Sequence, residues 1–267
     1  MEIVGFAASV LIGLSLGLIG SGGSILTVPI LVYLFGVNAV VSTSYSLFVV
    51  GLTSLIGSYS HFRKGNLDVR TALVFGLPSI LSVYAVRKFV VPIIPDPLFT
   101  VQDVVVSKSF SILILFSVLM IAAALSMIRK SKTEVSDCSQ KAHYNFPIIL
   151  GEGIFVGAVT GLVGAGGGFL IIPALVLFSG LCMKKAVGTS LLIIALKSLL
   201  GFTGDLGSGL HFDIPFMLTF AAFAIVGIIA GTLISKHISN EKLKPAFGWF
   251  VLAMGIYIIS KELLLLA

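Results

Sequence analysis

A glycine-rich motif that interrupts a long apolar stretch occurs twice in this chain. Gly17 to Val32 reads G-L-I-G-S-G-G-S-I-L-T-V-P-I-L-V, and Gly161 to Val176 reads G-L-V-G-A-G-G-G-F-L-I-I-P-A-L-V, 144 positions later. Glycine and proline both disfavour the interior of a regular helix, so each copy predicts a break. Short or interrupted apolar segments at matching positions of two halves indicate a transporter fold, with its substrate site at the breaks.

Composition restricts the class of protein further. Of the 267 residues 57% are hydrophobic and only 10% are charged, whereas soluble domains carry about 25% charged residues. The apolar runs are continuous, unlike the alternating strands of a membrane barrel. A backbone exposed to lipid must satisfy its own hydrogen bonds, which favours helices. We therefore expect an all-α polytopic membrane protein in contact with the lipid bilayer. The net charge of +6 is spread over separate loops, which argues against nucleic-acid binding.

Ten apolar segments can be read from the sequence. They cover residues 3–19, 24–36, 40–60, 67–86, 108–128, 147–163, 168–180, 186–204, 213–235 and 245–266. A full span takes about 20 residues, but the second and seventh segments have only 13 each. Each of these two follows a glycine cluster. They are either short spans or half-helices that form re-entrant hairpins with the segments before them.

The distribution of basic residues predicts the orientation in the membrane. If every segment changes sides, twelve basic residues fall on one face: Arg63, Lys64, Arg70, Arg129, Lys130, Lys132, Lys141, Lys184, Lys185, Lys236, Lys242 and Lys244. Four fall on the other: Arg87, Lys88, Lys108 and Lys261. Positive charge marks the cytoplasmic face, so both termini are expected outside. Re-entrant hairpins would give the same count.

The doubled glycine motif and the ten apolar segments predict two repeats. Residues 1–128 form the first membrane repeat, 129–146 a polar cytoplasmic linker, and 147–267 the second membrane repeat. Because each repeat holds five segments, an odd number, the second is expected to lie upside down relative to the first. Inverted repeats allow one architecture to open to either side of a membrane.

The glycine clusters are the candidate substrate site. A helix N-terminus exposes unpaired N–H groups and a partial positive charge, and glycine lets a ligand approach the backbone. Two such termini near the bilayer centre would hold an oxyanion. The alternative is that these glycines only allow close helix packing. The candidate residues are Gly20, Ser21, Gly22, Gly23, Ser24, Gly164, Ala165, Gly166, Gly167 and Gly168.

Lys197 is the charged residue that stands deepest in an apolar segment. A lysine at the bilayer centre costs about 2.5–3.5 kcal/mol on the most lenient scale, so it is expected to hold the anion. The alternatives are a structural ion pair with Glu152 or Asp205, or snorkelling to an interface. Ser44 and Ser190 occupy matching positions near the start of two long segments, where they either contact the ligand or cap the helix.

Catalytic and metal-binding patterns are not found in the sequence. It has no G-x-S-x-G, no H-E-x-x-H and no run of His, Asp and Cys at metal-ligand spacing, so we expect no enzyme, no catalytic residue, no metal and no cofactor. Cys138 and Cys182 lack C-x-x-C spacing. Both fall on the face expected to be cytoplasmic and reducing, which predicts free thiols.

The doubled motif, Gly188-Thr189-Ser190 and the run A-L-K-S-L-L-G-F-T-G that contains Lys197 together resemble the TauE/SafE family of sulfite and sulfonate exporters. The resemblance implies outward movement of sulfite or an organosulfonate across the bacterial inner membrane. Because the sequence has no nucleotide-binding motif, the energy is expected to come from an ion gradient or from the substrate's own gradient. Glu152 and Asp205 are the candidates for proton coupling. An anion channel, or an importer of another sulfur anion such as thiosulfate, remains as the alternative. The oligomeric state is not predicted.

Overall fold

The computed structural model describes residues 2–20, 22–101, 104–128, 146–177, 179–234 and 240–266. Helices dominate this part of the chain. They are α1 (Glu2–Ile19), the 3-10 helix η1 (Gly22–Leu26), α2 (Thr27–Phe35), α3 (Ala39–Arg63), α4 (Val69–Ala85), the π-helix η2 (Val86–Val90), α5 (Val91–Ile93), α6 (Lys108–Ile128), α7 (Phe146–Val163), α8 (Gly168–Leu177), α9 (Met183–Asp205), α10 (Ile214–Ile234) and α11 (Asn240–Leu266). All ten predicted apolar segments are helical.

Local sequence signals explain several helix boundaries. α2 ends at Gly36, whose φ of 66° is the left-handed conformation that commonly closes a helix. α3 begins after Asn38, whose side chain accepts a hydrogen bond from the Val40 N–H at 2.9 Å. α4 begins after Asp68, which accepts from the Thr71 N–H at 2.8 Å. Of the two alternatives for Ser44, capping of α3 is therefore wrong, because Asn38 caps this helix.

Five helices in the described residues are long and apolar enough to cross a membrane. They are Ala39–Arg63, Val69–Ile93, Lys108–Leu125, Lys184–Asp205 and Ile214–Ile234. The second of these includes η2 and α5, so the helix that was expected to end at residue 86 continues for seven more residues. Shorter apolar helices cover Val4–Leu18, Gly23–Phe35 and Pro147–Val163.

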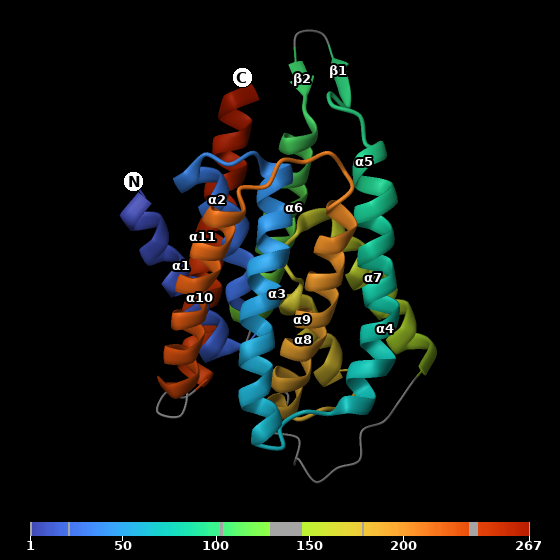
Figure 1. Ribbon diagram of the computed structural model, residues 1–267, viewed down its shortest axis with the longest axis vertical. Helices are drawn as coiled ribbons and strands as arrows, with labels where there is room; N and C mark the ends of the chain where they lie inside the picture. Colours follow the sequence, from blue (N-terminus) through green and yellow to red (C-terminus); the bar gives the residue numbers. More distant parts are fainter. Residues whose placement is uncertain are drawn as a thin grey trace.

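The helices form one elongated bundle (Figure 1). Both chain termini lie toward the same end, which we call the termini end, and the ribbon of β1 (Phe99–Val101) and β2 (Val104–Val106) lies there too. The two strands pair antiparallel, with Phe99 opposite Val106. This ribbon is a small departure from the expected all-helical chain, within the part that the structure describes.

The most extensive contacts join helices that are far apart in sequence. α1 packs against α10 and α4 against α7; α3 packs against α9 and α6 against α11; α4 also packs against α9 and α3 against α10. Glycines make one of these interfaces very close. A Cβ at Gly227 of α10 would lie 2.1 Å from the carbonyl oxygen of Val10 in α1. The two backbones are therefore in contact, as small residues allow between membrane helices.

Candidate functional site

The chain turns back at both glycine clusters. After α1, Gly20 has a φ of 88°, and η1 and α2 then return toward the termini end (Figure 1). After α7, Gly164, Gly166 and Gly167 have φ values of 72°, 64° and 66°. Residues with side chains rarely adopt these conformations. The predicted breaks are confirmed, and each is the tip of a helical hairpin. Ser21 lies outside the described residues.

The two hairpins are oriented oppositely. α1 starts at the termini end, whereas α7 starts at the other end of the bundle (Figure 1). Each tip meets the first turns of a long helix. A Cβ at Gly20 would lie 2.6 Å from Val187 of α9, and a Cβ at Gly164 would lie 2.3 Å from Thr43 of α3. η1 of the first hairpin also packs against α8 of the second, so the two hairpins touch one another inside the bundle.

The first cluster is tightly packed. A Cβ at Gly23 would lie 2.2 Å from the hydroxyl of Ser15 on α1, so Gly23 is needed for the hairpin to close. Ser24 is fully buried in η1. Thr27, the first residue of α2, is also fully buried, and its hydroxyl has no partner within the described residues. This hydroxyl at the start of α2 is a polar group that a ligand could satisfy.

The second cluster surrounds Lys197. This side chain is fully buried and its ammonium donates to the Thr160 hydroxyl at 3.2 Å. A Cβ at Gly167 would lie 2.8 Å from the Lys197 nitrogen, so this glycine leaves room for the ammonium. On the neighbouring side, a Cβ at Gly166 would lie 3.5 Å from the Ser198 hydroxyl, which is buried and without a partner in the described residues.

Lys197 has no carboxylate partner within the described part of the chain. Asp205 instead forms an ion pair with Arg87 at 3.2 Å, and Glu152 keeps one buried carboxylate oxygen without a hydrogen bond there. The structural ion pairs considered for Lys197 are therefore not formed. Lys197 lies 13 residues after Lys184 in the 22-residue span Lys184–Asp205, about 20 Å along the helix. Snorkelling is excluded as well, because the side chain is buried against the second hairpin.

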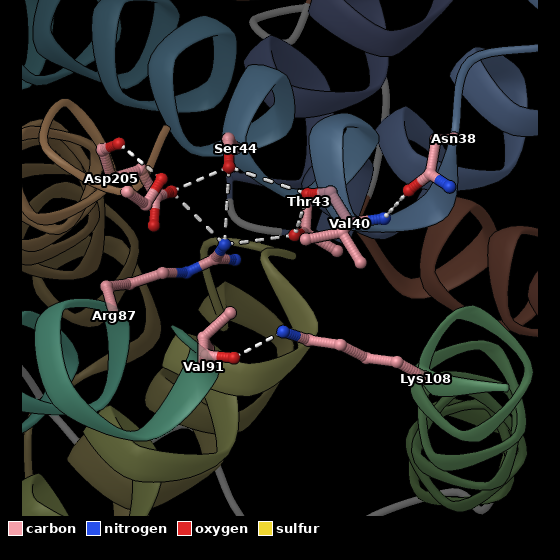
Figure 2. A network of polar contacts seen from close by, with 9 residues as sticks. Asn38, Val40, Thr43, Ser44, Arg87, Val91, Lys108 and Asp205 are labelled. Atoms are coloured by element: carbon pink, nitrogen blue, oxygen red, sulfur yellow. Dashed lines mark hydrogen bonds and ion pairs between the residues drawn. The ribbon is translucent and has the colours of Figure 1, made fainter. Parts of the chain in front are cut away.

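A second polar cluster lies toward the termini end. Arg87 of η2 donates through Nη1 to the Thr43 hydroxyl at 3.0 Å and to the Asp205 carboxylate at 3.2 Å. Ser44 donates to the same carboxylate at 2.7 Å (Figure 2). Arg87 and Asp205 are 0% and 1% exposed. The cluster connects α3 and η2 to the end of α9.

The predicted site residues therefore fall into separate groups. Gly166, Gly167 and Lys197 come together, with buried Ala165 and with Gly168 opening α8. Gly20, Gly22, Gly23 and Ser24 belong to the hairpin that adjoins it. Ser44 and Asp205 lie in the Arg87 cluster. Ser190 donates to the Val187 carbonyl of its own helix at 2.9 Å. It lies seven residues into α9, so it is not the cap of that helix.

Sequence reasoning missed Arg87, Thr160, Ser198 and Thr27. The sequence prediction puts Arg87 in an outer loop, because Arg87 and Lys88 interrupt the apolar run. The run Phe89 to Ile94, F-V-V-P-I-I, was the available signal that the helix continues.

One further prediction is wrong: Cys182 is disulfide-bonded rather than a free thiol, and Cys138 lies outside the described residues. No cluster of His, Cys, Asp and Glu able to hold a metal ion occurs among the described residues.

Long apolar helices, two broken hairpins and a buried ammonium beside one break define a polytopic membrane transport protein. The sequence comparisons agree with this class. The family described as sulfite exporter TauE/SafE matches residues 5–258, so this chain belongs to that family. Membership of this transporter family confirms the prediction that the protein is a multi-pass transporter rather than an enzyme.

Relatives match over nearly the whole length. A "probable membrane transporter protein" of Xylella fastidiosa (strain Temecula1) is 30% identical, covering 97% of this chain and 95% of the relative. The "probable membrane transporter protein YunE" of Bacillus subtilis is 27% identical, covering 95% of this chain and 97% of the relative. No solved structure matches this chain significantly.

Proposed function

We propose that this protein is a secondary transporter that moves a small sulfur oxyanion, sulfite or an organosulfonate, outward across the bacterial inner membrane. The observation that carries the proposal is Lys197, a fully buried ammonium whose one described partner is the neutral hydroxyl of Thr160. A buried charge is costly unless it is paired. An oxyanion held beside Gly166 and Gly167 would supply the missing negative charge. The family description names sulfite as the exported substrate.

The surrounding groups suit an oxyanion rather than a cation. The Ser198 and Thr27 hydroxyls are buried without described partners, and hydroxyls can donate to an anion. The N-terminal end of α8, which begins at Gly168, adds the partial positive charge of a helix dipole. All of these groups are neutral donors or carry positive charge. Ser44 and Ser190 remain predictions as ligand contacts.

An inverted repeat is the second part of the proposal. If residues 1–128 and 147–267 are equivalent, then α1, α3, α4 and α6 correspond to α7, α9, α10 and α11. The α1–α10 interface then corresponds to α4–α7, and α3–α10 to α4–α9, while α3–α9 and α6–α11 each correspond to themselves. This reciprocal packing supports two repeats related by inversion. It also provides two equivalent arrangements for alternating access.

The positions of the basic residues predict which end of the bundle faces the cytoplasm. The end of α3 and the start of α9, which carry Arg63, Lys64, Lys184 and Lys185, lie at the end opposite the termini (Figure 1). With the basic end in the cytoplasm, both termini are outside. Introduced cysteines at Gly65 and Gly209, on loops that follow α3 and α9, should react with a membrane-impermeant thiol reagent from the inside and the outside respectively. The reverse reactivity would overturn this orientation.

Transport should be tested with purified protein in proteoliposomes. We expect saturable uptake of radiolabelled sulfite or a sulfonate that exchanges against internal substrate. Lys197→Met should reduce uptake by at least about tenfold, because it removes a charge-assisted contact. Lys184→Met, an exposed position on the same helix, is the matched control and should transport normally. Uptake by Lys197→Met at the wild-type rate would refute the site.

Other results would identify a different function. Uptake of thiosulfate in preference to sulfite and sulfonates would favour an importer of another sulfur anion. Conductive flux without exchange would favour an anion channel. Repeating the assay with and without a pH gradient tests proton coupling, for which Glu152 and Asp205 stay candidates. If wild-type protein transports none of these anions, the proposed function is wrong.

A further inference from the structure

Arg87 is a fully buried arginine in an unusual piece of helix. It lies in η2, a π-helical segment within the continuous helix Val69–Ile93, and its exposed fraction is 0%. π-helical turns are rare and occur frequently at functional sites. Gly204 lets α9 come close, because a Cβ there would lie 3.1 Å from the Arg87 Cβ. The guanidinium is thus enclosed by protein on several sides.

Within the described residues, only one nitrogen of the guanidinium, Nη1, has a hydrogen-bond partner. Nη1 donates to Thr43 and Asp205, at 3.0 and 3.2 Å, and is 3.4 Å from the Ser44 hydroxyl. Nε and Nη2 are buried and have no hydrogen-bond partner among the described residues. A guanidinium has five N–H donors, and three of them are on Nε and Nη2. Leaving charged donors buried and unsatisfied is costly.

The two unoccupied nitrogens are on the same edge of the guanidinium. The parallel N–H groups of Nε and Nη2 match two oxygens of a planar or tetrahedral oxyanion, which is the bidentate geometry that distinguishes arginine from lysine. Asp205 cannot fill this edge while it accepts from Nη1 on the other side. The edge therefore presents a donor pair for which the described protein supplies no acceptor.

A second cation, Lys108, lies near the cluster. Lys108, at the start of α6, donates to the Val91 carbonyl, and its charge interacts most strongly with Asp96 and less with Arg87 and Asp205. Figure 2 shows Arg87 and Lys108 extending inward from different helices. With Asp96 and Asp205 both present, two cations and two carboxylates balance in this region. The case for an anion therefore rests on the unsatisfied Nε and Nη2 donors of Arg87.

We propose that the Nε–Nη2 edge of Arg87 is a second anion subsite, toward the termini end, for the same sulfur oxyanion that Lys197 holds. This inference rests on the proposed function. Asp205 lies eight residues beyond Lys197 on α9, about 12 Å along the helix, so the two subsites are separate binding sites. Asp205 holds the guanidinium in place, and its negative charge lowers the subsite's affinity so that the anion can leave.

The test is equilibrium binding of radiolabelled sulfite to purified wild-type and variant proteins. Arg87→Lys keeps the charge facing Asp205 but removes the bidentate edge, and it should weaken sulfite binding at this subsite roughly tenfold. Asp205→Asn removes the competing charge and should tighten binding several-fold. An ion pair with only a structural role would not tighten binding when broken. Lys88→Met, an exposed charge on the next residue, is the matched control and should bind as wild type does.

A second pair of measurements separates binding from folding. Thermal unfolding without anion should show that Arg87→Lys remains folded. The double variant Arg87→Met/Asp205→Asn removes both charges of this ion pair, so it should fold and still lack the subsite. Wild-type affinity in Arg87→Lys or in the double variant, or unchanged or weaker affinity in Asp205→Asn, would overturn the proposal. If sulfite uptake depends on Lys197 while the Arg87 variants behave normally, only the second subsite fails. If wild-type protein neither binds nor transports sulfite or sulfonates, the proposed function fails first.

Discussion

Replacing Gly167 by alanine tests whether the second glycine break is built for the ammonium of Lys197. The backbone at Gly167 has a φ of 66°, and an added Cβ would lie 1.9 Å from the Thr160 methyl carbon and 2.8 Å from the Lys197 nitrogen. The left-handed conformation costs a residue with a side chain about 1–2 kcal/mol. Overpacking in a filled interior costs about 1–3 kcal/mol more. Gly167→Ala should therefore destabilise the protein by about 2–5 kcal/mol.

The assay is thermal unfolding in detergent, with sulfite uptake measured in parallel. Thr160→Ser removes the methyl group that clashes and keeps the hydroxyl that accepts from Lys197, so adding it to Gly167→Ala should recover the steric part of the loss. Gly151→Ala is the control: nothing lies within 4 Å of a Cβ there, and alanine in a helix is favoured by about 0.5–1 kcal/mol. Equal stability of Gly167→Ala and wild type, or no recovery in the double variant, would refute the packing described here.

Three further predictions concern other parts of the bundle. Gly227→Ala should lower the unfolding temperature and reduce uptake, because its Cβ would lie 2.1 Å from the Val10 carbonyl oxygen; a neutral effect would contradict the close α1–α10 contact. Asp68→Ala should cost about 0.5–2 kcal/mol by removing the cap of α4, and Asp68→Asn should restore most of it in the same unfolding assay. Tyr33→Phe removes a 2.8 Å hydrogen bond to buried Glu262 and should cost about 1–3 kcal/mol in the same assay; unchanged stability would contradict a contribution from this bond.

Much of the fold follows from the apolar pattern. The ten segments, the two breaks and the short helices after them depend on local composition, and the structure confirms them. The ends of segments were less predictable. Arg87 was read as the outer end of a span because an isolated arginine is costly in a membrane. Its carboxylate partner, Asp205, lies 118 residues away in the other half of the chain. No local sequence feature indicates that the two residues pair.

The site was predictable in its backbone and less so in its side chains. Gly166, Gly167 and Lys197 were selected from the sequence, and the structure brings them together. Thr160 was not selected, since its contact with Lys197 depends on how α7 and α9 pack. Ser190 illustrates the opposite case: its position suggested a cap or a ligand contact, but its hydroxyl bonds to its own helix. Serine within a helix often bonds to a preceding carbonyl in this way.

The pairing of α1 with α10 has a consequence for biosynthesis. These helices are separated by roughly 200 residues, from Ile19 to Ile214. A ribosome adding about 5–20 residues per second would need on the order of 10–40 seconds to make the intervening chain. During that interval α10 is not yet made, so the glycine face of α1 is exposed to lipid or to the insertion machinery. Neither half of the chain made alone should reach the native arrangement, whereas halves synthesised together as separate chains should assemble.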